Sequence, residues 1–136
     1  MTNNLSFDFW WTRTFLEDKK VIFDAIKDRW SIFTPAWWIV KSKDDIHRFM
    51  NDLVKDKPFK KASHNSFAYR IKLENGSILE WKNDDWETGA WMCILRELQR
   101  ENYVDSIVVV SRHFWWIHLN ADRFKHIINA SKLILK

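Results

Sequence analysis

The sequence predicts an α+β fold in which two to three helices pack on a mixed β-sheet. Segments with the alternation or β-branched content of strands recur along the chain, and segments with helical apolar spacing separate them. The dipeptide Asn75-Gly76, a strong hairpin signal, lies between two strand-like segments. With 136 residues, 46% of them hydrophobic and 29% charged, the chain has the length and composition of one globular domain.

The first half of the chain predicts a strand pair and a helix. The β-rich segment 21–26 and the extended segment 31–40 flank the turn-like KDRW, and Pro35 fits best at a sheet edge or a bulge. Segment 42–55 predicts a helix with Ser42 as its N-cap. Its apolar residues at helical spacing are Ile46, Phe49, Met50, Leu53 and Val54.

A hairpin and a second helix are predicted next. Segment 63–73 alternates as a half-buried strand does, and segment 77–81 returns after the Asn75-Gly76 turn. Segment 88–101 predicts a helix. The alternating residues of the strand are Phe67, Tyr69, Ile71 and Leu73, and the inward residues of the helix are Ile94, Leu95 and Leu98.

The last part predicts a central strand and a C-terminal helix. Segment 106–114 has a continuous apolar centre, IVVV, which is typical of a strand covered on both faces. The helix begins near Ala121, and its apolar side carries Phe124, Ile127, Ile128, Leu133 and Ile134. We expect residues 1–27 to form an N-terminal extension with the first strand, and residues 28–136 to form a single globular unit.

Composition and charge exclude several classes of protein. The apolar runs are too short to cross a membrane, and the N-terminus lacks the features of a secretion signal. The single cysteine, Cys93, excludes an internal disulfide and a multi-cysteine zinc site, so we expect a cytoplasmic protein without cofactor or metal. The net charge of +4 is concentrated in segments 41–61 and 112–136, which is compatible with phosphate contacts and equally with a solvated face.

Ten tryptophans against two glycines are the most unusual feature of the composition. Glycine normally supplies roughly 7% of a domain. Several tryptophans stand in turn-like segments that favour glycine, such as DRWS and NDDWETGAW, or in adjacent pairs. We hypothesise that many of these tryptophans occupy glycine positions. A codon such as UGA, which the source organism would read as glycine, would then have been translated here as tryptophan. The alternative is a Trp-rich surface that stacks on sugars or on single-stranded RNA.

An acidic turn and a histidine carry candidate chemistry. Asp84, Asp85 and Glu87 would hold Mg²⁺ through water, or they would cap the helix that follows. With His64 as a base, the first alternative gives a metal-dependent hydrolase or a phosphate-handling enzyme; the second leaves His64 structural. Cys93 lies inside a predicted helix near its buried side, where cysteine is usually inert.

The loop after the central strand and the start of the last helix form a candidate anion site. Arg112 ends the central strand, and Asp122, Arg123 and Lys125 open the helix. If the WW pair between them were Gly-Gly, the backbone would approach a ligand at the helix N-terminus. The alternative is that Arg123 pairs with the acidic turn and braces the two loops.

Five segments match a known pattern in the same order: DRWSIF, KKASHNSFAYRI, NDDWETGAWMCIL, VVVSRHFWWIHL and ADRFKHIINASKLIL. On these segments the chain resembles the IMPACT family, also called the YigZ family or uncharacterised protein family 29. The motif spacing is similar to that of the eukaryotic branch. The family has glycines where this chain has Trp86, Trp91, Trp115, Trp116 and Asn120.

The resemblance implies a domain similar to domain 2 of ribosomal protein S5. It also implies a non-enzymatic role in translation regulation, with RNA, the ribosome or a translation-control protein as partner and no membrane. Eukaryotic members carry an N-terminal RWD domain, for which we expect this chain to have no room. The candidate binding surface comprises His64, Asp84, Asp85, Glu87, Arg112, Asp122, Arg123 and Lys125.

Overall fold

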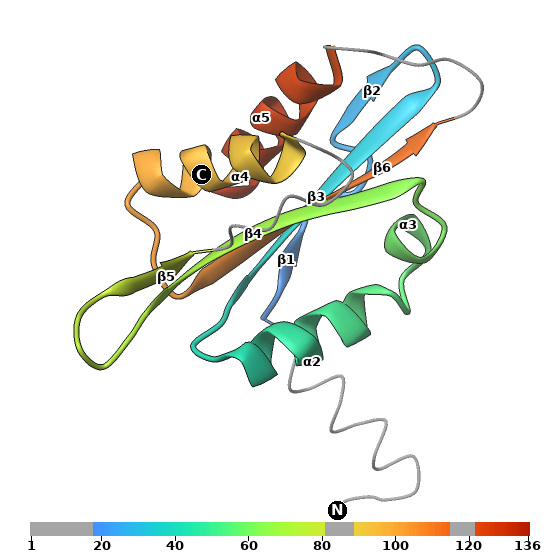
Figure 1. Cartoon of the computed structure of the whole chain (residues 1–136). Coiled ribbons are helices and arrows are strands. Elements are labelled where there is room, and N and C mark those ends of the chain that lie inside the picture. The colour runs from blue at the N-terminus through green and yellow to red at the C-terminus, as the bar shows by residue number, and fades with distance from the viewer. Residues whose placement is uncertain (1–17, 81–88, 115–121) are drawn as a thin grey trace, which may run out of the picture.

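A six-stranded sheet lies between two helical layers in the computed structural model, which describes residues 18–80, 89–114 and 122–136 (Figure 1). The α+β class is confirmed. The expectation of a mixed sheet is wrong, because every pairing between described strands is antiparallel. Strands β3 (Ser31–Ile39) and β4 (His64–Lys72) run in the same direction, but β6 (Ser106–Phe114) lies between them and opposes both.

One edge of the sheet is an interrupted strand. The expected strand over 21–26 is instead two short strands, β1 (Lys20–Val21) and β2 (Ile26–Asp28), both paired with β3. The chain turns at Asp24, whose φ of 51° is left-handed. The carbonyl of Pro35 accepts from the amide of Ile22 at 3.1 Å, so the proline nitrogen also faces this interruption, where no ladder donor is required. The proline, expected at a sheet edge or a bulge, therefore lies where the pairing of β3 with the edge strands is interrupted.

The helix α2 (Lys43–Leu53) begins and ends close to the predicted bounds. Ser42 is its N-cap and accepts a hydrogen bond from the amide of Asp45 at 3.2 Å. Its predicted apolar face is buried at Ile46, Phe49 and Leu53 and partly buried at Met50, whereas Val54 is the C-cap residue and 46% exposed. A one-turn helix, α3 (Lys57–Lys60), follows with a proline in its first turn.

The second hairpin joins β4 to β5 (Ile78–Glu80) through Gly76, whose φ of 89° favours glycine. The prediction that β4 is half-buried is wrong, because Ala68 on its second face is fully buried against the helix α4 (Ala90–Arg100). Leu73, expected in the alternating row, follows the strand and is 40% exposed. The central position of β6, with both faces covered, is confirmed.

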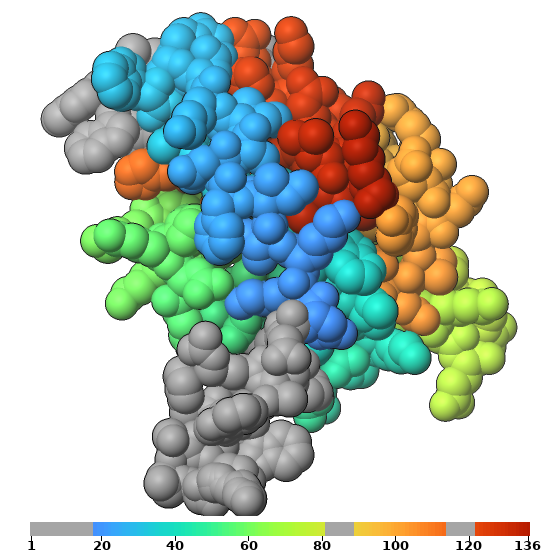
Figure 2. All heavy atoms as spheres, turned by 180° about the vertical axis from the view of Figure 1, so that it is seen from behind, coloured from blue at the N-terminus to red at the C-terminus, as the bar shows by residue number. Residues whose placement is uncertain are grey.

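Two hydrophobic clusters hold the layers together. One joins alternate residues of the sheet to α4 and α5 (Asp122–Ile134), and the other joins the remaining sheet residues to α2 and α3. In Figure 2 the segment of β1 and β2 lies along the sheet edge between α5 (red) and α3 (green). Among the described residues, no helix combines the length and apolar content that crossing a membrane requires.

The starts of α4 and α5 approach each other closely. Gly89 precedes α4 with a φ of 94°, and a Cβ added to it would lie 3.4 Å from the ring of Phe124. Cys93 is half-buried in α4, beside the hydrophobic cluster that joins the sheet to α4 and α5, as expected. Burial raises the pKa of its thiol. The two helices therefore meet near their first turns, at Gly89 and Phe124.

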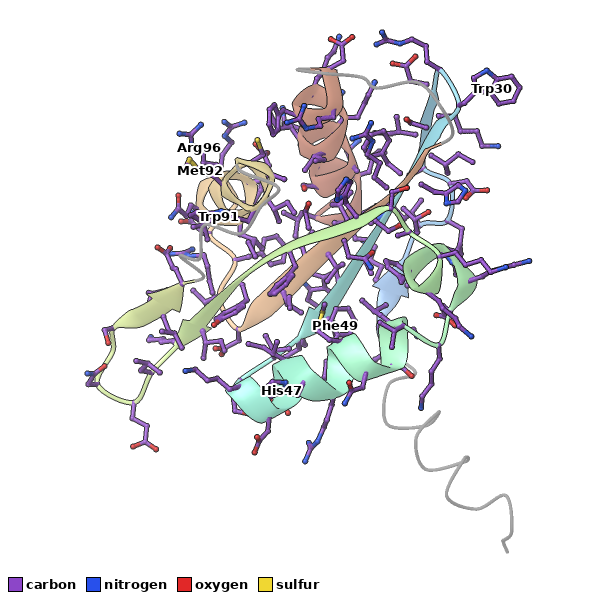
Figure 3. The ribbon with its side chains drawn as sticks, turned by 45° about the vertical axis from the view of Figure 1, so that its right-hand side comes forward. Trp30, His47, Phe49, Trp91, Met92 and Arg96 are labelled. Carbon is purple, nitrogen blue, oxygen red and sulfur yellow. The ribbon has the colours of Figure 1, made fainter. Side chains whose placement is uncertain are left out.

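The described tryptophans are scattered over the molecule. Trp30 lies in the β2–β3 turn with a φ of 69°, is 73% exposed and projects away from the fold (Figure 3). Both central residues of this turn have positive φ, since Arg29 has 45°, as in the type I′ turn that favours glycine. Trp91 lies in the first turn of α4 (labelled in Figure 3), where it is half-buried and packs against the hydrophobic cluster beneath the helix.

The adjacent pair Trp37-Trp38 does not occupy a turn. Both residues lie within β3, as expected of the extended segment 31–40, and neither has a positive φ, so this pair is not at a turn that favours glycine. Trp38 is 5% exposed, stacks on Phe49 and donates its indole N–H to Asp18 at 2.7 Å. Trp37 packs edge-on to Tyr103 in the other cluster. A single stacking surface is therefore not formed by the tryptophans of the described segments; Trp86, Trp115, Trp116 and Asn120 lie outside those segments.

Candidate functional site

One end of the sheet gathers most of the described motif residues. We define this "motif end" as the β2–β3 turn (28–31), His64, Arg112 and the first turn of α5 (122–126). The strand register places His64 opposite Arg112, and Arg112 opposite Phe33. Residues opposite one another in an antiparallel ladder present their side chains on the same face. The strands therefore bring together motif residues that are about 30 to 80 positions apart in the sequence.

His64 and Arg112 share the sheet face covered by α4 and α5. Val110 and Val108, two and four residues before Arg112, belong to the cluster on that face. Arg112 is 5% exposed and His64 is half-buried. Burying a guanidinium is costly unless neighbouring groups compensate for the lost water. We therefore infer that Arg112 interacts within the interior of this end and does not lie on an open surface.

An ion-pair network connects the β2–β3 turn to α5. The Asp28 carboxylate accepts from the Arg29 guanidinium at 3.1 Å and from Nε2 of His126 at 2.7 Å. Arg29 also pairs with Asp122 in the first turn of α5. The ring centre of His126 lies 5.3 Å from that of Phe33, the residue opposite Arg112 in the sheet. The ion-pair network therefore lies next to the His64–Arg112 pair.

The network shifts the ionisation of its members. The Arg29 guanidinium and then His126 hold the pKa of Asp28 below its ordinary value, because both donate to the ionised carboxylate. The carboxylates of Asp28 and then Asp122 raise the pKa of Arg29. Both groups are solvent-accessible, so the network fixes the geometry of the turn and helix more than it adds stability.

The remaining predicted site residues divide into two groups. Arg123 and Lys125 lie in the first turn of α5, where the Arg123 guanidinium is 4.3 Å from the centre of the Phe124 ring and Lys125 is exposed. The acidic turn Asp84, Asp85 and Glu87 lies outside the described segments, so its proposed pairing with Arg123 stays a prediction. Within those segments no group of three or more His, Cys, Asp or Glu side chains is placed to hold a metal ion.

Sequence reasoning missed three members of this site. Asp28 and Arg29 stood in the DRWSIF motif, and His126 in DRFKH, but neither motif alone indicated a partner for its charges. Opposite charges in two motifs at opposite ends of the chain were a usable signal. Their pairing became visible only with the strand order, which places the start of β3 beside the start of α5.

Comparison with known proteins agrees with these motifs. The family model of the Impact N-terminal domain matches residues 29–135. The chain belongs to the IMPACT family. Protein IMPACT-B of Xenopus tropicalis and Protein IMPACT of Danio rerio are each 40% identical to it over 113 residues, covering 82% of this chain and 36% of the relative. The Protein IMPACT homolog of Dictyostelium discoideum is 36% identical over 111 residues, covering 82% of this chain and 32% of the relative.

Solved structures also resemble the chain. The structure of the two-domain translational regulator Yih1 aligns with a TM-score of 0.52 and 33% identity, covering 81% of this chain and 43% of that one. The crystal structure of a hypothetical protein aligns with a TM-score of 0.67 but 14% identity, covering 86% of this chain and 60% of that one, and shows the fold alone. The chain therefore spans about a third of the curated IMPACT relatives above and less than half of the regulator.

Proposed function

We propose that this chain is a non-enzymatic binding domain of a translation regulator, and that the motif end is its contact surface for RNA or the ribosome. The observation that supports a role in translation is family membership together with the likeness to the translational regulator Yih1. The relatives are longer than this chain, so the proposal concerns a binding activity of this domain and not the complete action of a regulator.

The chemistry of the motif end supports binding rather than catalysis. Asp28, Arg29, Asp122 and His126 are engaged in mutual ion pairs, and Arg112 is buried. A general base or nucleophile needs a group that is accessible and not committed to a structural partner. Lys125 is an exposed basic residue of this end with no part in that ion-pair network; it lies next to Arg123 on the same helical turn, and such residues contact phosphates through charge.

A salt titration tests this function. The chain is mixed with a fluorescent single-stranded RNA at increasing KCl concentrations, and the slope of log Kd against log salt concentration reports the number of phosphate contacts. We expect Lys125→Gln and Arg123→Gln each to weaken binding and to reduce that slope by about 1. Lys132→Gln, on the exposed part of the last turn of the same helix, is the matched control and should leave both unchanged.

Two outcomes would remove the RNA proposal. One is an absence of saturable binding at low salt, and the other is an affinity that does not change with salt or with either substitution. Retention of ribosomes from which the RNA at the surface has been digested, again lost in Lys125→Gln, would instead assign the surface to a protein partner.

We also infer that Trp30 occupies a position suited to glycine, in support of the recoding hypothesis. Its left-handed φ and its exposure are what a glycine position filled by an indole would give. Trp38, by contrast, has a stacking partner and a hydrogen bond that only an indole uses. The codons of the gene test the idea directly: a UGG codon at position 30 would contradict it.

A further inference from the structure

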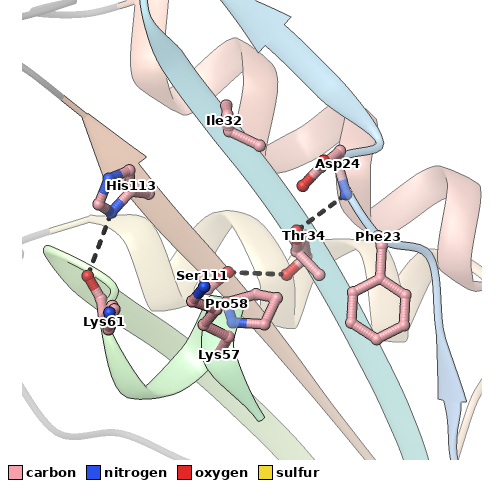
Figure 4. Close-up of a pocket in the computed structure, with 9 residues that line it drawn as sticks. All are labelled: Phe23, Asp24, Ile32, Thr34, Lys57, Pro58, Lys61, Ser111 and His113. Atoms are coloured by element: carbon pink, nitrogen blue, oxygen red, sulfur yellow. Dashed lines mark hydrogen bonds between the residues drawn. The ribbon is translucent and has the colours of Figure 1, made fainter.

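A pocket of about 400 Å³ opens on the sheet face opposite α4 and α5, beside α3 (Figure 4). It lies beside the interruption of the edge strand, where the chain between β1 and β2 turns at Asp24. Its volume is within the range of about 300–1,000 Å³ that is typical of small-molecule sites. Its lining residues are Phe23, Asp24, Ile32, Thr34, Lys57, Pro58, Lys61, Ser111 and His113.

The floor of the pocket is polar and fixed in place. The Thr34 hydroxyl accepts from the amide of Asp24 at 3.0 Å, and the Ser111 hydroxyl donates to the carbonyl of Thr34 at 3.3 Å. Thr34 is 1% exposed and Ser111 is 2% exposed. Both hydroxyls are therefore buried and engaged, and they hold the floor of the pocket in place.

The walls of the pocket differ in chemistry. Phe23 is 57% exposed, which is unusual for a phenyl ring, and together with Ile32 and Pro58 it provides the apolar part. Lys57 and Lys61 provide positive charge at the mouth, and both are exposed. The acidic residue nearest to Lys57 in sequence, Asp56, accepts from Lys19 at 3.1 Å and so is already engaged.

We propose that this pocket binds a nucleotide, with the base against Phe23 and Pro58 and the phosphate at Lys57 and Lys61. An inorganic anion would leave the apolar wall unused, and an apolar ligand would leave the positive charge of the two lysines unused. A nucleotide carries a flat π face, sugar hydroxyls and a charged phosphate in one molecule, and each has a counterpart here. The Asp24 carboxylate can accept from a ribose hydroxyl or an exocyclic amine.

The same chemistry is offered by a free mononucleotide and by the 5′-terminal nucleotide of an RNA strand. The pocket lies on the opposite sheet face from Arg123 and Lys125, so its variants and those of the motif end are independent. Failure of nucleotide binding therefore leaves the proposed RNA-binding function untouched, and the reverse also holds.

Calorimetric titration of the full chain tests the proposal, with AMP, GMP, CMP and UMP as probes. Adenosine and inorganic phosphate are titrated as the two halves of the ligand. We expect saturable binding of at least one mononucleotide, and an affinity at least tenfold higher than that of either half, because only the whole molecule uses both walls. Absence of saturable binding by all four mononucleotides, or phosphate or adenosine binding as tightly as AMP, would overturn the proposal.

Substitutions test the contributions of the lysines and of the apolar wall to binding separately. Lys57→Gln and Lys61→Gln should each weaken mononucleotide binding about three- to tenfold and leave adenosine binding unchanged. Phe23→Leu, which keeps an apolar side chain but removes the ring, should weaken both by a similar factor. Lys132→Gln is the matched control. All four positions are exposed, and unchanged thermal unfolding confirms an intact fold. Mononucleotide affinity unaffected by all three pocket substitutions would place the ligand elsewhere and overturn the proposal.

A final comparison identifies the source of the nucleotide. A 5′-phosphorylated RNA pentamer is titrated beside the same pentamer without the phosphate. If the phosphorylated strand binds at least tenfold more tightly than the mononucleotide and loses this affinity in Lys57→Gln, the pocket holds an RNA end. If the mononucleotide binds as tightly or more tightly, the pocket serves a free nucleotide. Both results support the proposal, whereas an RNA affinity independent of the 5′-phosphate and of Lys57 excludes the RNA end.

Discussion

Replacement of Trp30 separates the effect of its backbone conformation from that of its side chain. The residue has a φ of 69° and is 73% exposed, so the indole makes limited contacts while its Cβ occupies a left-handed conformation. Trp30→Gly and Trp30→Ala both remove the indole, and they differ only in the Cβ. Their difference in the free energy of unfolding therefore measures the backbone preference alone.

The sign of that difference is the prediction. A left-handed conformation costs a residue with a Cβ about 1–2 kcal/mol relative to glycine. At an ordinary helical or extended position, glycine is instead less stable than alanine by roughly 0.5–1 kcal/mol. We expect Trp30→Gly to be more stable than Trp30→Ala by about 1 kcal/mol after this entropic term is included. For a domain of this size, that corresponds to a rise of about 3–6 °C in the unfolding temperature.

Trp91 provides the matched control, because it lies within α4 with no positive φ. There the order should be reversed, with Trp91→Ala more stable than Trp91→Gly by up to about 1 kcal/mol. Equilibrium unfolding in urea measures all four variants, with equal m-values confirming a common unfolded state. If Trp30→Ala is at least as stable as Trp30→Gly, the left-handed assignment at this turn is wrong, and with it the structural support for a glycine position.

Four further predictions concern the rest of the fold. Ser42→Ala should lower the free energy of unfolding by about 1 kcal/mol, measured in urea, because the α2 N-cap bond is lost. Phe49→Ala should cost about 3–5 kcal/mol in the same assay, because the ring is fully buried. The pKa of Asp28 is depressed in the folded chain, so this carboxylate adds stability above its ordinary pKa of 3.8, and that stability is lost as the pH falls toward the folded-state pKa. The unfolding temperature of Asp28→Asn should therefore fall less steeply at acid pH than that of the unsubstituted chain. An identical dependence on pH would contradict this. Iodoacetamide at pH 7.5 should alkylate Cys93 more slowly in the folded chain than in urea, because burial raises its thiol pKa; equal rates in mass spectrometry would refute it.

Elements with strong local signals were predictable from the sequence. The Ser42 cap, the Asn75-Gly76 turn and the apolar centre of β6 each act through neighbouring residues, and each was found where expected. The split of segment 21–26 was not predictable, because its β-rich composition is continuous and the interruption depends on Pro35 across the ladder. The burial of the second face of β4 was also not predicted, because Ala68 is small and adds nothing to the hydrophobic alternation of the strand, yet it packs against α4.

The candidate site was predictable only in part. Motif residues such as His64 and Arg112 were found from their segments, but their juxtaposition depends on strand register. The pocket had no motif at all, because its residues come from a turn, the one-turn helix α3 and the alternate positions of two strands. Sequence patterns carry local geometry well, whereas a site formed by nonlocal pairing is specified only once the sheet order is known.

The place of β6 in the sheet has a consequence for biosynthesis. The strand that separates β3 from β4 is synthesised after every other described strand, so the nascent chain has two unsatisfied strand edges until residue 114 leaves the ribosome. Pairings of such long sequence separation form slowly. We expect this domain to depend on its final third for cooperative folding, and to be vulnerable to chaperone capture or aggregation while translation is paused before that point.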